Sequence, residues 1–283
     1  MPVLVPTSLD DAVSMLAGSP DMLVLAGGTD AMNEVNAGHR RPQSVLAVNR
    51  VAELRSWTYN PEAGTVRIGA AVTYAELMEP PIADLVPALA EASRTVGSPQ
   101  IRHAGTLGGN LGTCSPAGDG LPVLAALEAV VHLASSTGER SLPVAEFMVG
   151  VKRTARRSDE LITAITVPVL RGYQGYSKVG VRNAMVIALA TACVVVDVPT
   201  RSLRLAIGSV GPTIIRCTEA EQYAAAAIDF DGSRASADVV AQFGELAAAA
   251  SRPIDDHRAT AAYRRHAIGV LAGRLLRRAF PVE

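Results

Sequence analysis

The stretch TLGGNLGTCSPAGD, residues 106–119, has two adjacent glycines near its start and one acidic residue, Asp119, at its end. Nine of its fourteen residues are Gly, Ala, Ser, Thr or Cys, so little side-chain bulk covers the backbone. Adjacent glycines allow unusual φ/ψ angles and the close approach of a ligand. Consecutive N–H groups that point the same way form a concave anion site. We therefore interpret this stretch as part of a phosphate-binding site.

A second Gly-Gly pair lies in AGGTD, residues 26–30. One such pair alone is typical of a tight turn, but two pairs with the same plan favour a ligand site. Thr29, Thr106 and Asn110 add short hydrogen-bonding side chains. Asp119 can accept hydrogen bonds from ribose or ribitol hydroxyl groups and can also cap the helix expected to begin near Leu121, and the two roles are compatible. Neither stretch matches GxGxxG or GxxxxGK[ST], which excludes the ordinary Rossmann and P-loop explanations.

Composition excludes several classes of protein. The 283 residues are 49% apolar and 19% charged with a net charge of -1, which indicates a globular protein that binds no nucleic acid. The three cysteines form no CxxC motif, so neither a structural zinc nor an iron–sulfur cluster has its ligands here. With no membrane-span pattern and no signal-peptide pattern, we expect a soluble cytoplasmic protein.

Residue patterns predict alternating strands and helices in the first part of the chain. We expect helices over 8–16, 73–79, 87–96 and from 121, and strands over 22–26, 44–49, 130–135, 161–169 and from 66. Small residues over 172–198 predict either a helix or a strand, and residues 201–217 a pair of strands. Residues 218–279 are Ala-rich with helical periodicity. A domain boundary is expected soon after the charged stretch 152–160.

Three stretches in this order carry a family resemblance: AGGTD, then SPQIRHAGTLGGNLGTCSPAGD at 98–119, then GYSKVGVRNA at 175–184. They resemble the FAD-binding medium subunit of the molybdenum hydroxylases, of the xanthine dehydrogenase and carbon monoxide dehydrogenase type. The resemblance extends over nearly the whole chain. It implies an α+β fold: a two-lobed FAD-binding domain of the PCMH/VAO type over 1–170, with lobes of about 1–55 and 56–170, then a C-terminal domain of a small sheet plus helices over 171–283.

The resemblance also implies site residues for FAD. Two turns would hold the pyrophosphate, one formed by Leu25, Ala26, Gly27, Gly28, Thr29 and Asp30 and the other by Thr106, Gly108, Gly109 and Asn110. Thr113 and Asp119 would bind the phosphate and ribose region. Lys178 would lie near the isoalloxazine, where a cation stabilises reduced, anionic flavin and raises its potential. Backbone at Leu161 or Ile162 would line the ring. We nominate no catalytic residue and no metal ligand.

Partners are implied in the same way. A large molybdopterin-binding subunit and a small two-cluster 2Fe-2S subunit would join this chain in a hetero-hexamer with two copies of each. The chain would receive electrons on FAD and pass them to an external acceptor. The candidates for that acceptor are NAD, oxygen and a quinone. Two alternatives stay open: a stand-alone flavin oxidoreductase, which would need an acid–base pair near the ring, and a non-redox nucleotide-binding module.

Three features differ from the usual sequence of this family. His103 stands where Asn is usual, and Cys114 stands where Ala is usual. We interpret His103 as a loop residue hydrogen-bonded to backbone, and Cys114 as a small buried side chain. The run from Lys152 to Arg157 is unusually basic, and we interpret it as a solvated face in preference to a docking or acceptor-binding loop.

Overall fold

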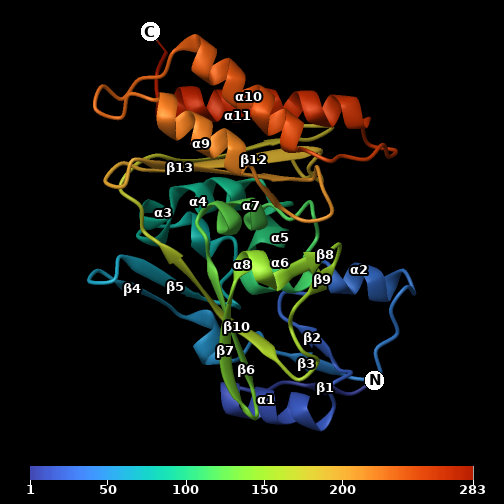
Figure 1. Ribbon diagram of the computed structural model, residues 1–283. Coiled ribbons are helices and arrows are strands. Elements are labelled where there is room, and N and C mark those ends of the chain that lie inside the picture. The colour runs from blue at the N-terminus through green and yellow to red at the C-terminus, as the bar shows by residue number, and fades with distance from the viewer. Residues whose placement is uncertain (283) are drawn as a thin grey trace.

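The computed structural model describes residues 1–282, most of which belong to three β-sheets of three to five strands, one two-stranded sheet and the helices packed on them (Figure 1). The first sheet is parallel, with strand order β1-β3-β2. Its elements are β1 (Val3–Leu4), α1 (Leu9–Gly18), β2 (Leu23–Leu25), α2 (Ala31–Asn36) and β3 (Val45–Ala47). The predicted first helix is confirmed: Ser8 caps α1 by accepting from Asp11 N, and Ala12 and Leu16 are fully buried.

The second sheet is antiparallel and follows the order β4-β5-β10-β6-β7. Its strands are β4 (Trp57–Asn60), β5 (Thr65–Gly69), β6 (Val130–Ser135), β7 (Gly138–Pro143) and β10 (Leu161–Pro168). The segment predicted as a helix over 73–79 contains only a 3-10 turn, η2 (Glu76–Met78), because Tyr74 and Ala75 donate their N–H groups to Gly105 and Arg102. Residues 70–75 are therefore held against residues 102–108, which brings two distant segments together.

Short elements join this sheet to the rest of the chain. They are η1 (Ala52–Arg55), α3 (Ile82–Leu85), α4 (Pro87–Arg94), α5 (Pro99–Ala104), α6 (Leu107–Thr113), α7 (Gly120–Ala126), α8 (Val144–Phe147), β8 (Met148–Gly150) and β9 (Arg153–Thr154). One apolar cluster combines the N-terminal sheet with the second one, since Leu16 and Leu46 pack with Leu54, Ala71 and Leu161. The two lobes therefore share buried contacts along their common edge.

The C-terminal sheet is antiparallel in the order β11-β12-β13-β14. Its strands are β11 (Gln174–Val179), β12 (Ala190–Asp197), β13 (Ser202–Gly208) and β14 (Ile215–Arg216), so the open assignment over 172–198 resolves to strands. Helices α9 (Thr218–Ala227), α10 (Ala237–Ala250) and α11 (Ala261–Ala279) cover one face, and α4 and α7 lie against the other (Figure 1). Seven of the eight β12 residues are buried, which explains why the strand is a continuous run of small and apolar residues.

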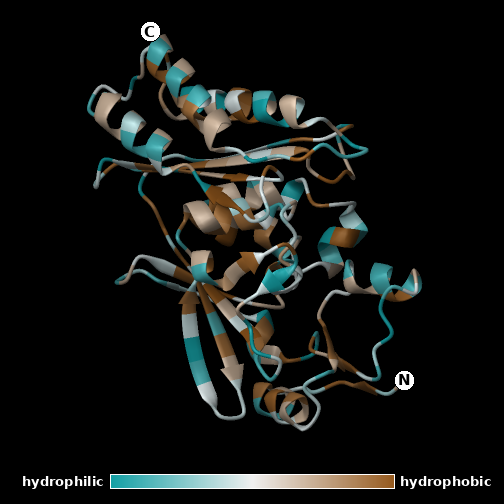
Figure 2. Cartoon of the chain, turned by 45° about the vertical axis from the view of Figure 1, so that its right-hand side comes forward, coloured by the Kyte–Doolittle hydropathy of each residue, from teal (hydrophilic) through white to brown (hydrophobic). Residues whose placement is uncertain are grey.

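Hydrophobic and hydrophilic residues alternate along the C-terminal helices, which is typical of helices with one buried face (Figure 2). The two faces of the C-terminal sheet belong to different apolar clusters. Tyr176 and Cys193 pack toward α4 and α7, whereas Val194 and Leu205 pack toward α9–α11. Within residues 1–282, no helix is long and apolar enough to cross a membrane.

Candidate functional site

A cavity of about 490 Å³ lies between the two N-terminal lobes, a size typical of cofactor and small-molecule sites. The turn before α2, helix α6, the loop before α7 and the start of β10 form its walls. Fourteen of the fifteen predicted site residues line it: Leu25, Ala26, Gly27, Gly28, Thr29, Asp30, Thr106, Gly108, Gly109, Asn110, Thr113, Asp119, Leu161 and Ile162. The fold therefore brings together segments that are more than a hundred residues apart.

The first glycine turn, residues 26–30, has the properties expected of an anion site. Gly28 has φ +70°, a left-handed conformation that favours glycine. A Cβ on Gly27 would lie 1.8 Å from the Ala104 carbonyl oxygen, so this glycine permits contact with the segment before α6. Within the described chain, the N–H groups of Gly28, Thr29 and Asp30 donate to no protein acceptor. Three successive amides at the cavity wall are available to an anion.

The second glycine turn differs from the expectation. Gly108 N donates to the Ala70 carbonyl at 2.9 Å, and Gly109 N donates to Thr106 Oγ1 at 3.0 Å, because Thr106 caps α6. The prediction of free consecutive N–H groups is therefore wrong for residues 106–110. What this turn offers a ligand is short side chains and an uncovered backbone surface.

The glycines of the second turn have separate roles. A Cβ on Gly108 would lie 2.6 Å from the Ala70 carbonyl oxygen, so packing between the segments requires glycine there. A Cβ on Gly109 would meet only Thr106 Oγ1, at 3.0 Å, and Gly109 is exposed at the cavity wall. Thr113 Oγ1 donates to Asp30 Oδ2 at 3.3 Å and so connects the two turns. Gly109 is the glycine whose missing side chain leaves room in the cavity.

Asp119 is held by two buried donors. Its Oδ1 accepts from the Tyr176 hydroxyl and its Oδ2 from Lys178 Nζ, both at 2.8 Å. The Asp119 and Lys178 side chains are only 10% and 8% exposed. Burial raises the pKa of Asp119, and the charge of Lys178 opposes that rise. Although Asp119 directly precedes α7, its side chain makes no capping hydrogen bond, so the capping alternative is wrong.

Lys178 is the one predicted site residue that does not line the cavity. Its Nζ also donates to the Thr95 carbonyl at 3.1 Å, and Asp119 stands between it and the cavity. The lysine charge is thus compensated within the protein. Lys178 would therefore act on a ligand in the cavity only indirectly, by holding the Asp119 carboxylate.

The three features that differ from the usual sequence of the family are placed differently by the structure than the sequence suggested, except for Cys114. Cys114 is 3% exposed, which confirms the buried assignment, and its φ of +49° ends α6. His103 is exposed in the last turn of helix α5, so its assignment to a loop is wrong. The solvated-face interpretation of the basic run is also wrong in part, because Lys152 and Arg156 line the cavity. Lys152 Nζ lies 2.6 Å from Glu34 Oε1 of α2.

Sequence reasoning missed several residues at the cavity. Arg40, Tyr74, Glu160 and Ile187 also line it. Arg40 and Ile187 lie in loops that contain no recognisable sequence motif, so only the fold shows that they line the cavity. The Tyr74 Oη and Asn110 Oδ1 atoms are buried and have no hydrogen-bond partner within residues 1–282. A polar ligand or ordered water would satisfy these atoms.

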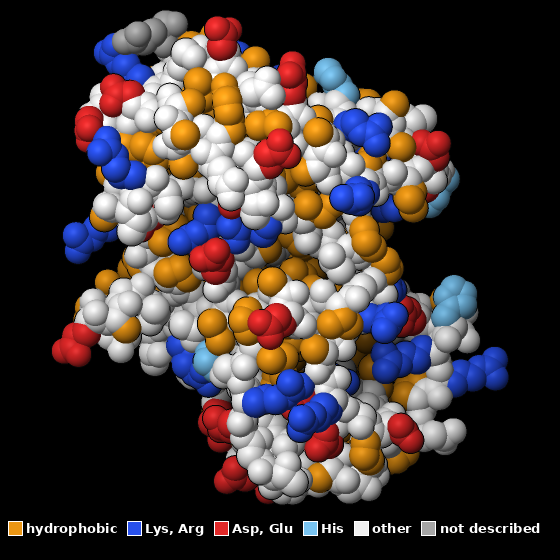
Figure 3. All heavy atoms as spheres, in the orientation of Figure 1, with side chains coloured by type: hydrophobic (Ala, Val, Ile, Leu, Met, Phe, Trp, Pro, Cys, Tyr) orange, Lys and Arg blue, Asp and Glu red, His pale blue; other side chains and the backbone are white. Residues whose placement is uncertain are grey.

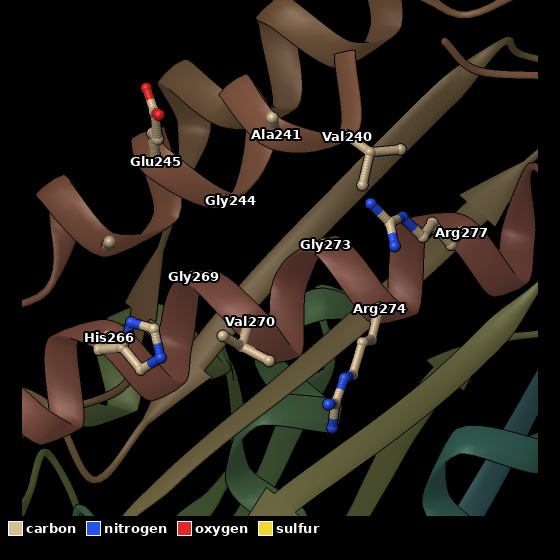
Figure 4. A pocket seen from close by; sticks show the side chains of 11 residues that line it. Val240, Ala241, Gly244, Glu245, His266, Gly269, Val270, Gly273, Arg274 and Arg277 are labelled. Carbon is tan, nitrogen blue, oxygen red and sulfur yellow. The ribbon is translucent and has the colours of Figure 1, made fainter. Parts of the chain in front are cut away.

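A shallower hollow of about 390 Å³ lies between α10 and α11 (Figure 4). The two helices approach closely at its glycines, because a Cβ on Gly244 would lie 2.7 Å from the Gly269 carbonyl oxygen. Arg277 points toward Val240 there, whereas Arg274 points away from α10. This hollow lacks the free amides and the buried ion pair of the larger cavity.

Glu160 holds the end of the basic run by hydrogen bonds, and its lowered pKa makes the stability of the protein depend on pH. Its side chain accepts from Arg140 Nε at 2.5 Å, Arg140 Nη2 at 2.8 Å and Arg157 N at 2.6 Å. The Arg140 hydrogen bonds hold the pKa of Glu160 below its usual value, outweighing the effect of burial. A carboxyl with a lowered folded-state pKa contributes stability above its unfolded pKa and loses it as the pH falls through the folded value.

We expect Glu160→Gln to melt at a lower temperature than the wild type at pH 7. The difference should shrink as the pH falls from about 5 to about 3, since the wild type loses the contribution of this carboxylate there. Calorimetry across this range checks the prediction, with exposed Glu62→Gln as control. A constant difference at every pH would show that Glu160 stabilises the lobe without its charge.

The cavity residues fit an elongated cofactor that has a pyrophosphate between two ring systems. Three free amides at the first turn suit phosphate oxygens, and the apolar side chains of Val24, Val48 and Leu54 form a wall for a flat ring. The polar groups of Thr106, Asn110 and Asp119 suit hydroxyl groups. The fold and the cavity together define a two-lobed dinucleotide-binding protein of the flavoprotein class.

Comparison with known proteins identifies the family. Residues 1–170 match the FAD binding domain in molybdopterin dehydrogenase, and residues 176–279 match the CO dehydrogenase flavoprotein C-terminal domain. The chain is 32% identical over 268 residues to the glyceraldehyde dehydrogenase medium chain of Sulfolobus acidocaldarius, covering 93% of this chain and 92% of the relative. It is 28% identical over 281 residues to the carbon monoxide dehydrogenase medium chain of Hydrogenophaga pseudoflava, covering 97% and 93%.

A solved structure of reconstituted CO dehydrogenase from Oligotropha carboxidovorans superposes with a TM-score of 0.89 and 27% identity, covering 99% of this chain and 97% of that one. The predicted fold class is confirmed. The chain belongs to the family of FAD-binding medium subunits of molybdenum hydroxylases, of the xanthine and carbon monoxide dehydrogenase type. It is a FAD-binding subunit of an oxidoreductase.

Proposed function

We propose that this chain transfers electrons within a molybdenum hydroxylase complex, taking them from iron–sulfur clusters of a small partner subunit and passing them to an external acceptor. FAD, when bound, accepts and releases the electrons. The observation that carries the proposal is the cavity between the lobes, which fourteen of the expected FAD-binding residues line. We further propose the division into a FAD-binding domain over 1–170 and a C-terminal domain over 171–283.

In this proposal the residues of the cavity hold and orient FAD. The free amides of Gly28, Thr29 and Asp30 would bind the pyrophosphate. Asp119 retains acceptor positions beyond those used by Tyr176 and Lys178, and it would accept hydrogen bonds from ribityl or ribose hydroxyl groups. Lys178 would act by positioning Asp119 at the flavin end of the cavity.

The arrangement of charges favours electron transfer over independent substrate chemistry. A stand-alone flavin oxidoreductase needs a titratable acid or base beside the ring. The two buried carboxylates at this cavity, Asp119 and Glu160, are both in ion pairs, with Lys178 and Arg140. The non-redox alternative is set aside, because the family to which the chain belongs binds FAD.

The proposed complex contains a large molybdopterin-binding subunit, a small 2Fe-2S subunit and this chain, with two copies of each. Named relatives that are called medium chains support this composition. We propose the cytoplasm as its compartment, in agreement with three free, buried cysteines. NAD, oxygen and a quinone are the candidate acceptors.

Removal of FAD from the assembled complex tests the proposal. We expect the flavin-free complex to reduce its iron–sulfur clusters with the complex's own substrate but to lose turnover with the external acceptor. Adding FAD should restore turnover. The measurement is rapid-mixing absorption spectroscopy together with steady-state acceptor reduction. Unchanged turnover after complete removal of FAD would contradict the electron-transfer role.

A further inference from the structure

One end of the cavity is basic, and both lobes contribute to it. Helix α6 runs along the cavity from Thr106 to its end beside Lys152, whose N–H donates to the Cys114 carbonyl at 3.0 Å. Arg40 follows α2 in the first lobe, and Arg156 lies between β9 and β10 in the second lobe. Lys and Arg side chains gather on the molecular surface in the region of α2, β8 and β9 (Figure 3).

The two glutamates at this end already have partners. Glu34 pairs with Lys152 at 2.6 Å, and Glu160 is bonded to Arg140 and to the Arg157 N–H. Within residues 1–282, Arg40 and Arg156 form no ion pair with a carboxylate. Burial lowers the pKa of Arg156 most strongly, the charges of Glu160 and Asp159 raise it, and the charge of nearby Arg40 lowers it further. An anionic ligand would relieve this unfavourable pairing.

Arg156 is fixed in position before any ligand binds. Its Nη1 donates to the Glu160 carbonyl at 2.6 Å and to the Arg157 carbonyl at 3.0 Å. Its Nε and Nη2 donate to no partner within the described chain and remain free for a ligand. A guanidinium held in this way can stack on a purine ring or donate to phosphate oxygens. Both groups occur together in an adenine nucleotide.

We infer that Arg40 and Arg156 bind the adenylate half of FAD from opposite lobes and make the chain select FAD over FMN. This inference rests on the proposed function, in which the flavin lies at the Asp119 end and the pyrophosphate at residues 28–30. The basic end then remains for the adenosine. Since each lobe supplies one arginine, the adenylate also holds the two lobes together.

Binding measurements on the full-length apoprotein test the inference with FAD, FMN and ADP as ligands. We expect Arg156→Met to weaken FAD and ADP binding by the same factor, about tenfold or more, because charged hydrogen bonds are lost. FMN, which lacks the adenylate, should bind unchanged. Arg156→Lys keeps the charge but loses the planar fork, so its effect on FAD should be smaller. Arg40→Met should follow the pattern of Arg156→Met.

Arg153→Met is the matched control, because Arg153 belongs to the same basic run but does not line the cavity. Equal weakening of FAD and FMN by Arg156→Met would overturn the inference, as would unchanged FAD affinity. The adenylate site could instead serve a nucleotide acceptor. If the variants weaken NADH binding to the FAD-loaded protein and leave FAD affinity intact, the assignment to FAD is wrong. Failure of the wild type to bind any flavin would contradict the proposed function as well.

Discussion

Gly109→Val is expected to weaken FAD binding by about 100-fold, the effect of several lost or strained contacts in a packed site. Gly109 lies in the first turn of α6 and is exposed at the cavity wall, and its new Cβ would meet only Thr106 Oγ1, at 3.0 Å. A valine there keeps the helix but places two methyl groups in the space that the cofactor needs. Fluorescence titration of the apoprotein with FAD measures the change.

The fold should survive this substitution, and neighbouring glycines supply the controls. Gly18→Val, at the exposed end of α1 with no atom within 4 Å of its new Cβ, should bind FAD normally. Gly108→Ala should instead lower the melting temperature, because its Cβ would lie 2.5 Å from the Ala70 side chain. Normal FAD affinity in Gly109→Val would show that the cofactor does not pass over α6.

Asp119→Ala is expected to lower the free energy of unfolding by about 3–5 kcal/mol, the usual cost of leaving a buried charge without its partner. Lys178 is 8% exposed and its ammonium group would keep only the Thr95 carbonyl. FAD binding should weaken as well, because the cavity loses an acceptor for hydroxyl groups. Chemical denaturation measures the first effect and FAD titration the second.

The double variant Asp119→Ala/Lys178→Met separates the two roles of Asp119. Removing both charges should restore most of the stability, since replacing an entire buried ion pair is often nearly neutral. FAD affinity should remain low, because the carboxylate that faces the cavity is still absent. If the double variant recovered FAD affinity together with stability, Asp119 would act on the fold alone.

The sequence predicts the parts of the site that depend on local chemistry. The glycine turns as segments of a ligand site and the buried Cys114 follow from short motifs, and the cavity brings the expected segments together. Strand β12 illustrates the limit. Its small apolar residues suit a helix or a strand equally, and burial of both faces by different layers decides for the strand.

Long-range contacts set the features that local sequence reasoning could not predict. The Gly108 N–H donates to the Ala70 carbonyl. The position of Ala70 depends in turn on the pairing of residues 70–75 with residues 102–108. The same applies to Lys178, whose charge is compensated by Asp119 across 59 residues. Arg40 has no motif around it, and its place at the cavity depends on how the first lobe packs on the second.

Retention of FAD by the purified chain tests the central claim most directly. The chain is mixed with FAD, desalted and examined by absorption spectroscopy, alone and in complex with its partner subunits. We predict flavin bands at about 370 and 450 nm with one FAD per chain, and loss of these bands in Gly109→Val. A chain that retains no flavin in either form would contradict the assignment of this cavity to FAD.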